Sequence, residues 1–220
     1  ENLIENGNVR VNGEVFKEFV ISDNVIKKIS VLNKTIKKKK TEVWCFNKPK
    51  GYVCSNKEQS TQKSFFRLLP KNFSRVVSVG RLDIPSEGLL ILTTNPTLST
   101  FLENPKNQIQ RKYHVKISGI IPKKLELIKN GINIDGISYE KIDFINIKEN
   151  YLEMTLIEGK NREIRKIMNF FNLNVLKLKR IKYGPFSLGN LKSGEYKKIS
   201  ETRLISSLKI LGFEDACNFW

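Results

Sequence analysis

The sequence predicts an α+β fold in which a mixed, largely antiparallel central sheet carries a few flanking helices, preceded by a small separate module. Three observations predict it. Segments of alternating apolar residues dominate the chain from residue 42 onward. The helical patterns between them are too few for a regular alternation of strand and helix. A lysine run at 37–40 separates this region from the first part of the chain.

The first part of the chain, residues 1–40, has the pattern of a small, incomplete module followed by a charged linker. Residues 3–6 are typical of the end of a helix, and residues 9–13 alternate like a strand that enters an Asn-Gly turn. The lysines at 37–40 repel one another, which disfavours compact structure and offers charges to phosphates. We therefore expect a domain boundary near Thr41.

The second part, residues 41–220, has patterns that predict its elements in order. They are a strand at 43–46 that ends in a Pro-Lys-Gly turn, a core strand at 89–94, a break at 95–96, a short helix at 98–102, a strand at 113–117, a helix over 122–128, an Asp-Gly hairpin turn at 135–136, a strand at 142–147 and a strand over 152–156. This order favours hairpins over crossover units.

The charge of the chain indicates its class of partner. The 39 Lys and Arg residues outnumber the 22 Asp and Glu residues, which gives a formal charge of +17 and a pI of about 9.8. Such a field attracts polyanions, so a nucleic acid is the leading partner. The alternative is lysine enrichment without a binding role. Basic residues alternate with apolar ones at 177–182, which favours charged faces on folded elements.

Several classes of function are disfavoured. No segment approaches the roughly 18 uninterrupted apolar residues that cross a bilayer, so we expect a soluble protein. The three cysteines, Cys45, Cys54 and Cys217, form no C-x-x-C pair, which argues against a disulfide framework or a zinc site and fits a reducing cytoplasm. The single histidine, His114, lies in an alternating segment and is expected to be a strand residue.

The first candidate for chemistry is Asp83. It ends the segment 80–83, and the Pro- and Gly-marked residues 84–88 and the apolar run 89–92 follow it. A carboxylate on a turn before a buried strand is held rigidly and stays reachable. The alternative is an aspartate that only caps the turn.

A second constellation spans residues 158–168, which predict a helix with Asn161 as its cap. A stripe with helical spacing faces the core; its members are Ile164, Ile167, Met168 and Phe171. Arg165 lies beside this stripe, where its guanidinium could hold a carboxylate through a bidentate pair. Asp83 is the natural partner. The alternative is a solvated basic face.

Taken together, these segments resemble the bacterial ribosomal RNA pseudouridine synthases of the type that carries an S-four-like RNA-binding domain before the catalytic one. The matching pieces are 48–51, 80–83 with 88–90, 111–115 with Gly119, 158–165, and 178–181 through 184–185. Gly80 distinguishes this branch from related synthases that have His there. Residues 2–13 resemble the second half of the S-four-like domain, whose first half would lie before Glu1. One departure, Asn-Pro-Thr at 95–97 in place of Asn-Asp-Gly, is expected to alter only a loop.

The resemblance implies the isomerisation of a uridine in RNA to pseudouridine. Asp83 matches the catalytic aspartate, which either attacks the ribose or promotes departure of uracil with formation of a glycal. Arg165 would keep that carboxylate ionised and aimed. Tyr113 matches the active-site tyrosine, on which uracil can stack. Arg81 resembles the arginine that fills the gap left by the flipped nucleotide.

The resemblance and the charge pattern also predict partners. The residues expected to contact RNA are Arg81, Lys48, Lys50, Lys160, Arg162, Lys179 and Arg180. Ribosomal RNA or an assembling ribosomal subunit is the expected partner, with a monomeric enzyme that needs no metal and no organic cofactor.

Two alternatives come from other classes. A nonenzymatic RNA-binding or ribosome assembly factor would account for the charge, but it would not require Asp83, Tyr113 and Arg165 together. A carboxylate-pair hydrolase would use Asp83 with Glu87, at a separation that such enzymes define narrowly.

Overall fold

The computed structural model describes residues 2–18, 29–35, 40–55 and 62–213. The chain divides into two compact units, residues 1–40 and 41–219, which are described separately. Most of the predicted lysine linker and Cys217 lie outside the described residues.

The first unit is a short helix followed by two hairpins. Its elements are α1 (Asn2–Glu5), β1 (Val9–Val11), β2 (Glu14–Val15), β3 (Ile29–Val31) and β4 (Lys34–Thr35), and the strand order is β2-β1-β3-β4 with every described pair antiparallel. Asn12 and Gly13 join β1 to β2 with φ of 53° and 95°, the left-handed conformations that a tight hairpin turn requires. The predicted helix end and Asn-Gly turn are confirmed.

The second unit is built on a nine-stranded sheet with the path β11-β12-β8-β13-β7-β5-β15, to which β6 and β14 add at the side. Its strands are β5 (Val43–Lys48), β6 (Val77–Val79), β7 (Glu87–Thr93), β8 (Arg111–Ser118), β11 (Asp143–Lys148), β12 (Tyr151–Leu156), β13 (Asn174–Tyr183), β14 (Phe186–Ser187) and β15 (Tyr196–Lys198). Within this sheet only the β13–β7 pair is parallel among the described strands. The predicted mixed, largely antiparallel sheet is confirmed.

Few helices cover this sheet, as predicted. They are α2 (Pro96–Glu103), α3 (Glu163–Phe170), α4 (Glu201–Ile210) and the 3₁₀ helices η2 (Phe65–Leu68), η3 (Pro105–Asn107) and η4 (Lys123–Asn130). A separate hairpin, β9 (Ile132–Ile134) and β10 (Ile137–Tyr139), turns at the predicted Asp-Gly pair.

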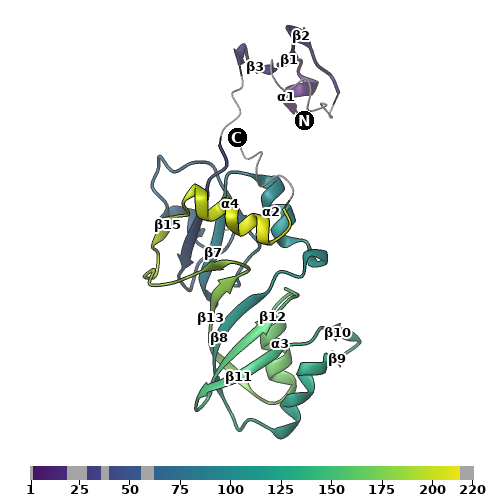
Figure 1. Ribbon diagram of the computed structural model, residues 1–220, viewed down its shortest axis with the longest axis vertical. Coiled ribbons are helices and arrows are strands. Elements are labelled where there is room, and N and C mark those ends of the chain that lie inside the picture. The colour runs from purple at the N-terminus through teal and green to yellow at the C-terminus, as the bar shows by residue number, and fades with distance from the viewer. Residues whose placement is uncertain (1, 19–28, 36–39, 56–61, 214–220) are drawn as a thin grey trace. The chain divides into compact units, whose positions relative to one another are not determined.

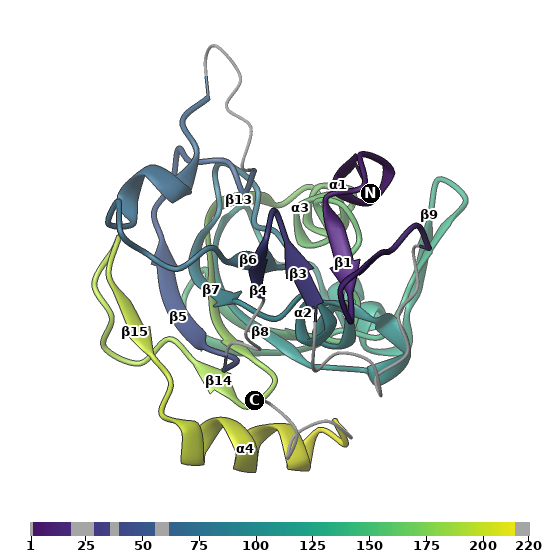
Figure 2. The ribbon, with the colours of Figure 1, turned by 90° about the horizontal axis from the view of Figure 1, so that it is seen from above.

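The core has two large parts, one in each half of the unit. In one half α2 and α4 pack on β5 and β7, and Figure 2 shows α4 flanking β5 and β14. In the other half α3 and η4 pack on β8, β11 and β12. Figure 1 shows β8 and β13 running from one half to the other. Loops at the junction of the halves are therefore held by cores on both sides.

The helices α2 and η4 differ from the predictions, one in where it starts and the other in its type. Pro96 is the first residue of α2, and the Asn95 side chain accepts hydrogen bonds from the main-chain N–H groups of Thr97 (2.9 Å) and Leu98 (3.2 Å). The segment 95–97 is thus a capped helix start and not only a loop, because Pro fits the first helical position. The helix predicted over 122–128 is the 3₁₀ helix η4.

The helix α3 buries its predicted stripe, but its cap was predicted wrongly. Arg162, not Asn161, occupies the N-cap position, with φ 54° and ψ 31° in the left-handed region. No side chain caps the helix from that residue. The left-handed turn instead sets the direction in which the preceding loop meets α3.

The structure places two of the three cysteines and the single histidine. Cys45 is a buried free thiol and Cys54 a half-buried one, and His114 is a strand residue on β8. Within the described part of the chain no three His, Cys, Asp or Glu side chains are grouped to hold a metal ion. None of the described helices has the length and apolar character to cross a membrane.

Candidate active site

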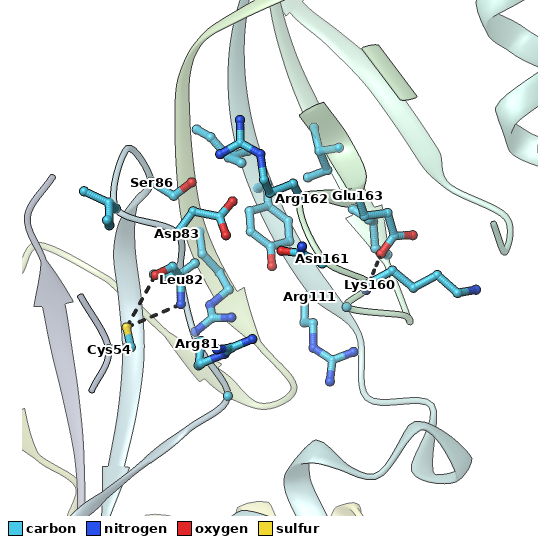
Figure 3. Close-up of a pocket in the computed structure, with 18 of the residues that line it drawn as sticks. Cys54, Arg81, Leu82, Asp83, Ser86, Arg111, Lys160, Asn161, Arg162 and Glu163 are labelled. Carbon is cyan, nitrogen blue, oxygen red and sulfur yellow. Dashed lines mark hydrogen bonds between the residues drawn. The ribbon is translucent and has the colours of Figure 1, made fainter. Parts of the chain in front are cut away.

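A cavity of about 920 Å³ opens where the two halves of the second unit meet (Figure 3). It is lined by the loop 80–86, the start of β8, the loop 158–163 before α3, and part of β13. Pockets that bury small ligands span roughly 300–1,000 Å³, so this one has room for a nucleotide and part of its surroundings.

Asp83 lies in the loop between β6 and β7 and is half-buried. Figure 3 shows its carboxylate directed into the pocket, with Arg81 on one side and Arg162 on the other. The loop closes on itself through the Ser86 N–H, which donates to the Asp83 carbonyl oxygen at 2.9 Å. The predicted turn before a buried strand is thus present, and it aims the acid at the cavity.

Lys48, at the end of β5, holds this loop through hydrogen bonds to its main-chain oxygens. It is 0% exposed, and its ammonium donates to the carbonyl oxygens of Pro49 (3.1 Å), Asp83 (3.3 Å) and Ser86 (2.9 Å). Burial lowers the pKa of Lys48, and the charge of Asp83 partly opposes this. The prediction that Lys48 contacts RNA is wrong, because its donors are already used inside the fold.

Cys54 forms two hydrogen bonds with the main chain of Leu82, the residue before Asp83. Its thiol donates to the Leu82 carbonyl oxygen at 3.5 Å and accepts from the Leu82 N–H at 3.4 Å. Burial raises the pKa of Cys54, with the Leu82 N–H acting in the opposite direction. The thiol therefore serves as a neutral clamp on the loop.

Arg165 reaches the same loop but does not pair with Asp83. Its Nη1 donates to the Val175 carbonyl oxygen at 3.0 Å and its Nη2 to the Pro85 carbonyl oxygen at 3.3 Å. The described contacts of Asp83 include no hydrogen bond or ion pair with Arg165, so the predicted bidentate clamp is wrong in this structure. Burial lowers the pKa of Arg165 and so does Arg162, while the charge of Asp83 raises it, so the two charges are close enough to interact.

Tyr113 and Arg180 are brought together on the pocket side of the sheet. They are register partners on β8 and β13, both are buried, and both line the pocket. The Arg180 Nε donates to the Leu89 carbonyl oxygen at 2.7 Å. Lys179 does not line the pocket, because successive strand residues point to opposite faces; its register partner is His114.

Arg111 is a buried pocket residue that the sequence did not single out as functional. Its Nη2 donates to the Tyr183 hydroxyl at 3.0 Å, and its Nη1 donates to the Ile157 carbonyl oxygen. The Tyr183 hydroxyl donates in turn to the Leu102 carbonyl oxygen at 2.8 Å. This chain of contacts ties β8 and β13 to α2 beneath the pocket.

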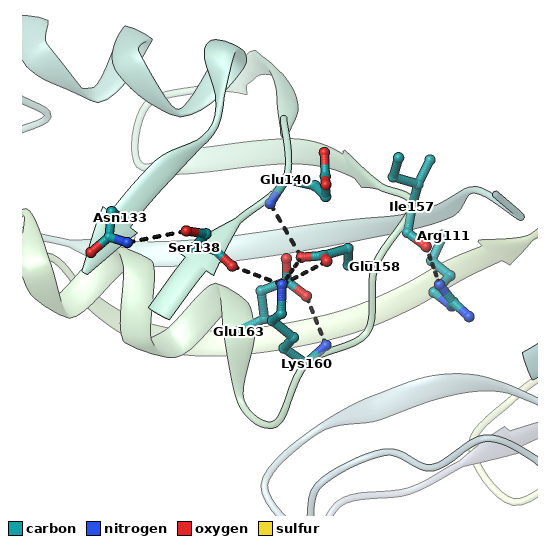
Figure 4. Close-up of polar contacts among 8 residues, drawn as sticks. All are labelled: Arg111, Asn133, Ser138, Glu140, Ile157, Glu158, Lys160 and Glu163. Carbon is teal, nitrogen blue, oxygen red and sulfur yellow. Dashed lines mark hydrogen bonds and ion pairs between the residues drawn. The ribbon is translucent and has the colours of Figure 1, made fainter. Parts of the chain in front are cut away.

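The carboxylates of Glu158 and Glu163 hold the loop before α3 through contacts with Lys160 (Figure 4). The Lys160 ammonium contacts the Glu158 carboxylate at 2.6 Å and the Ser138 carbonyl oxygen at 2.7 Å, and this pairing raises the pKa of Lys160. The Glu163 carboxylate accepts from the Lys160 N–H at 3.0 Å. Burial raises the pKa of Glu163 to about 7.

The predicted site residues therefore separate into two groups. Those that line the pocket are Arg81, Asp83, Tyr113, Lys160, Arg162 and Arg180; those that do not are Lys48, Lys50, Arg165 and Lys179. Glu87 also lies outside the lining and pairs with Lys177 at 3.0 Å. The hydrolase hypothesis, which needs Asp83 and Glu87 in one site, is thereby disfavoured.

Comparison with known proteins agrees with this geometry. Residues 42–170 match the family model described as RNA pseudouridylate synthase. A solved structure described as a pseudouridylate synthase superposes with a TM-score of 0.70 at 22% identity, covering 91% of this chain and 89% of that one, which supports the fold.

Two relatives cover nearly the whole chain. An uncharacterised RNA pseudouridine synthase of Rickettsia typhi is 36% identical over 98% of this chain and 91% of its own length. A protein of Buchnera aphidicola named ribosomal large subunit pseudouridine synthase B is 34% identical over 98% of this chain and 92% of its own length. The chain belongs to the RNA pseudouridine synthase family and is an RNA-modifying isomerase.

Proposed function

We propose that this enzyme converts a uridine of ribosomal RNA to pseudouridine, with Asp83 as the catalytic residue and with the target nucleotide turned out of its stack. The observation that carries the proposal is the Asp83 carboxylate directed into a nucleotide-sized pocket whose rim is basic. The name of the Buchnera relative and the net charge of +17 support ribosomal RNA as the substrate.

The chemistry exchanges one bond of the base for another. The bond between ribose C1′ and uracil N1 breaks and a bond between C1′ and uracil C5 forms. The C5 proton is lost and N1 takes up a proton, so the product is an isomer of the substrate. Asp83 either adds to C1′ as a nucleophile or removes the C2′ proton to give a glycal. Both routes need one ionised carboxylate at the ribose, and neither needs a metal or an organic cofactor.

The other pocket residues suit the remaining tasks. The ring of Tyr113 forms one wall, on which a uracil can stack. Arg81 and Arg162 are exposed at the rim, where guanidinium groups can bind phosphates and fill the gap that a flipped nucleotide leaves. Flipping costs a few kcal/mol, which such contacts offset.

We further propose that the first unit is part of an S-four-like RNA-binding domain. Its helix end and its Asn-Gly hairpin agree with that resemblance. We also propose that the enzyme acts as a monomer in the bacterial cytoplasm, where ribosomal RNA is assembled into ribosomal subunits.

The test is conversion of ribosomal RNA that was transcribed in vitro and so contains no pseudouridine. The protein is incubated with naked RNA and with assembling subunits, and new pseudouridine is mapped by carbodiimide treatment and primer extension. We expect one or a few positive sites with the wild type, none with Asp83→Asn, and unchanged sites with Glu87→Gln, whose carboxylate lies outside the pocket. Activity on transfer RNA alone would overturn the ribosomal assignment, and full activity of Asp83→Asn would overturn the role of the acid.

A further inference from the structure

Arg180 is a buried cation with an unused hydrogen-bond donor at the pocket. It is 2% exposed, and its Nη2 has no hydrogen-bond partner among the described residues. Its Nε is held by the Leu89 carbonyl oxygen, and its guanidinium carbon lies 5.0 Å from the centre of the Tyr183 ring. A buried donor without a partner has lost its hydrogen bonds to water with nothing in their place, so a fold that keeps one calls for an explanation.

The other cations of the pocket are either exposed or already engaged. Arg81 and Arg162 lie at the rim. Lys160 is paired with Glu158, and Arg111 donates to Ile157 and Tyr183. Among the described residues that line the pocket, Arg180 is the buried cation with a donor to spare.

The position of Arg180 places its charge near the reacting base. It is the register partner of Tyr113, so the two side chains emerge on the same face of the sheet. It also pairs with Gly88, just beyond the loop that carries Asp83, and the Arg180 main chain would lie only 2.3 Å from a side-chain carbon at that glycine. The main chain of Arg180 is thereby fixed beside Tyr113 and next to the strand that follows the Asp83 loop. The Arg180 guanidinium is held by the Leu89 carbonyl oxygen and the Tyr183 ring.

The proposed reaction produces a negative charge that needs such a donor. When C1′–N1 breaks by either route, its electron pair leaves with the base, so uracil departs as an anion with charge on N1 and on both carbonyl oxygens. The charge on the base disappears when C5 bonds to C1′, as the Asp83 carboxylate either leaves C1′ or returns its proton to C2′. The C5 proton is then lost and N1 takes up a proton. A fixed donor in a water-poor pocket stabilises such a transient anion more strongly than it stabilises the neutral base.

We infer that Arg180 is a catalytic residue that binds the detached uracil as its anion between cleavage of one bond and formation of the other. This inference rests on the proposed function. It differs from phosphate binding at the rim, because it predicts a loss in the chemical step and not in RNA affinity.

The experiment compares two substrates and three variants. The substrates are an RNA fragment with uridine at the mapped site and the same fragment with 5-fluorouridine, whose fluorine makes the departing base a more stable anion. The variants are Arg180→Gln, Arg180→Lys, and Arg203→Gln as a matched control on an exposed residue of α4. Three quantities are measured for each variant: the single-turnover rate at which the starting nucleoside disappears, the affinity for RNA, and the melting temperature of the protein.

We expect Arg180→Gln to slow the loss of uridine by about 100-fold and the loss of 5-fluorouridine by about tenfold or less. RNA affinity should stay unchanged. Arg180→Lys should recover part of the rate, and Arg203→Gln should match the wild type. Equal slowing of both substrates would indicate a structural role and overturn the inference, as would unchanged rates. A wild type that leaves uridine intact would overturn the proposed function itself.

Discussion

The Lys48 ammonium lies 3.3 Å from the carbonyl oxygen of Asp83, and the same group donates to the Ser86 carbonyl oxygen at 2.9 Å. A buried cation thus spans both ends of the turn that carries the Asp83 carboxylate. The contact is made to the main chain, so it fixes where the Asp83 side chain begins and leaves its carboxylate free for substrate.

Replacing Lys48 with Met should loosen this turn. Met is unbranched like Lys and only one atom shorter, but it leaves the carbonyl oxygens without donors. We therefore expect a loss of about 2 kcal/mol in the free energy of unfolding. We also expect kcat to fall at least tenfold while RNA affinity stays within twofold. Urea denaturation and single-turnover kinetics measure the two effects. Lys124→Met, on an exposed residue of η4, is the control. Equal stability of the two variants would contradict this account.

Elements with a strong local pattern were predictable from the sequence. Leu152, Met154 and Leu156 alternate along β12 and are all buried, and the Asp-Gly pair at 135–136 turns the β9–β10 hairpin. The loop that carries Asp83 was also predictable, because glycine, proline and a following apolar run are local signals. These features need no knowledge of distant contacts.

Partners of the buried cations were not predictable in the same way. Lys48 and Arg165 both bind main-chain carbonyl oxygens of the Asp83 loop, and every residue carries such an oxygen. Side-chain types therefore suggested RNA as the partner of Lys48 and a carboxylate as the partner of Arg165, whereas in the structure both bind main-chain oxygens. The opposite directions of Lys179 and Arg180, by contrast, follow from strand alternation, a signal that was present in the sequence.

Glu163 should make stability depend on pH. Its pKa is raised from 4.5 to about 7 by burial, so the folded state binds a proton that the unfolded state releases between these values. Stability from this group is complete below pH 4.5 and is lost as the pH rises through 7. Over that window the wild type should lose about 3 kcal/mol relative to Glu163→Gln, which does not titrate.

Chemical denaturation at half-unit intervals of pH measures this difference. Glu126→Gln, on an exposed residue of η4, controls for the loss of a surface charge. Parallel stability profiles of the wild type and Glu163→Gln would show that the pKa of the Glu163 carboxyl is the same in the folded and unfolded states, which would contradict this prediction.

Replacing Arg162 with Gly should weaken RNA binding without lowering the stability of the fold. Its φ of 54° places a long side chain in the left-handed region, where glycine is free of the penalty of roughly 1–2 kcal/mol. Arg162→Gly should therefore leave the protein as stable as the wild type or more stable by about 1 kcal/mol, while its affinity for RNA falls severalfold. Asn150→Gly changes a residue of the same conformation in the β11–β12 turn and should leave RNA affinity unchanged. A clear loss of stability in Arg162→Gly would show that the guanidinium supports the fold.

Cys54 should be a slow nucleophile despite its place beside the pocket. Burial raises its pKa, and its sulfur is held by both main-chain groups of Leu82, so the thiolate that attacks disulfide reagents is scarce. In a variant with Cys45→Ala and Cys217→Ser, the remaining thiol should react with Ellman's reagent at pH 8 at least tenfold more slowly than in denaturant. Once modified, the protein should lose activity, because the reagent removes the clamp on the residue before Asp83. Immediate reaction of the native thiol, or full activity after modification, would show that Cys54 does not hold the loop that carries Asp83.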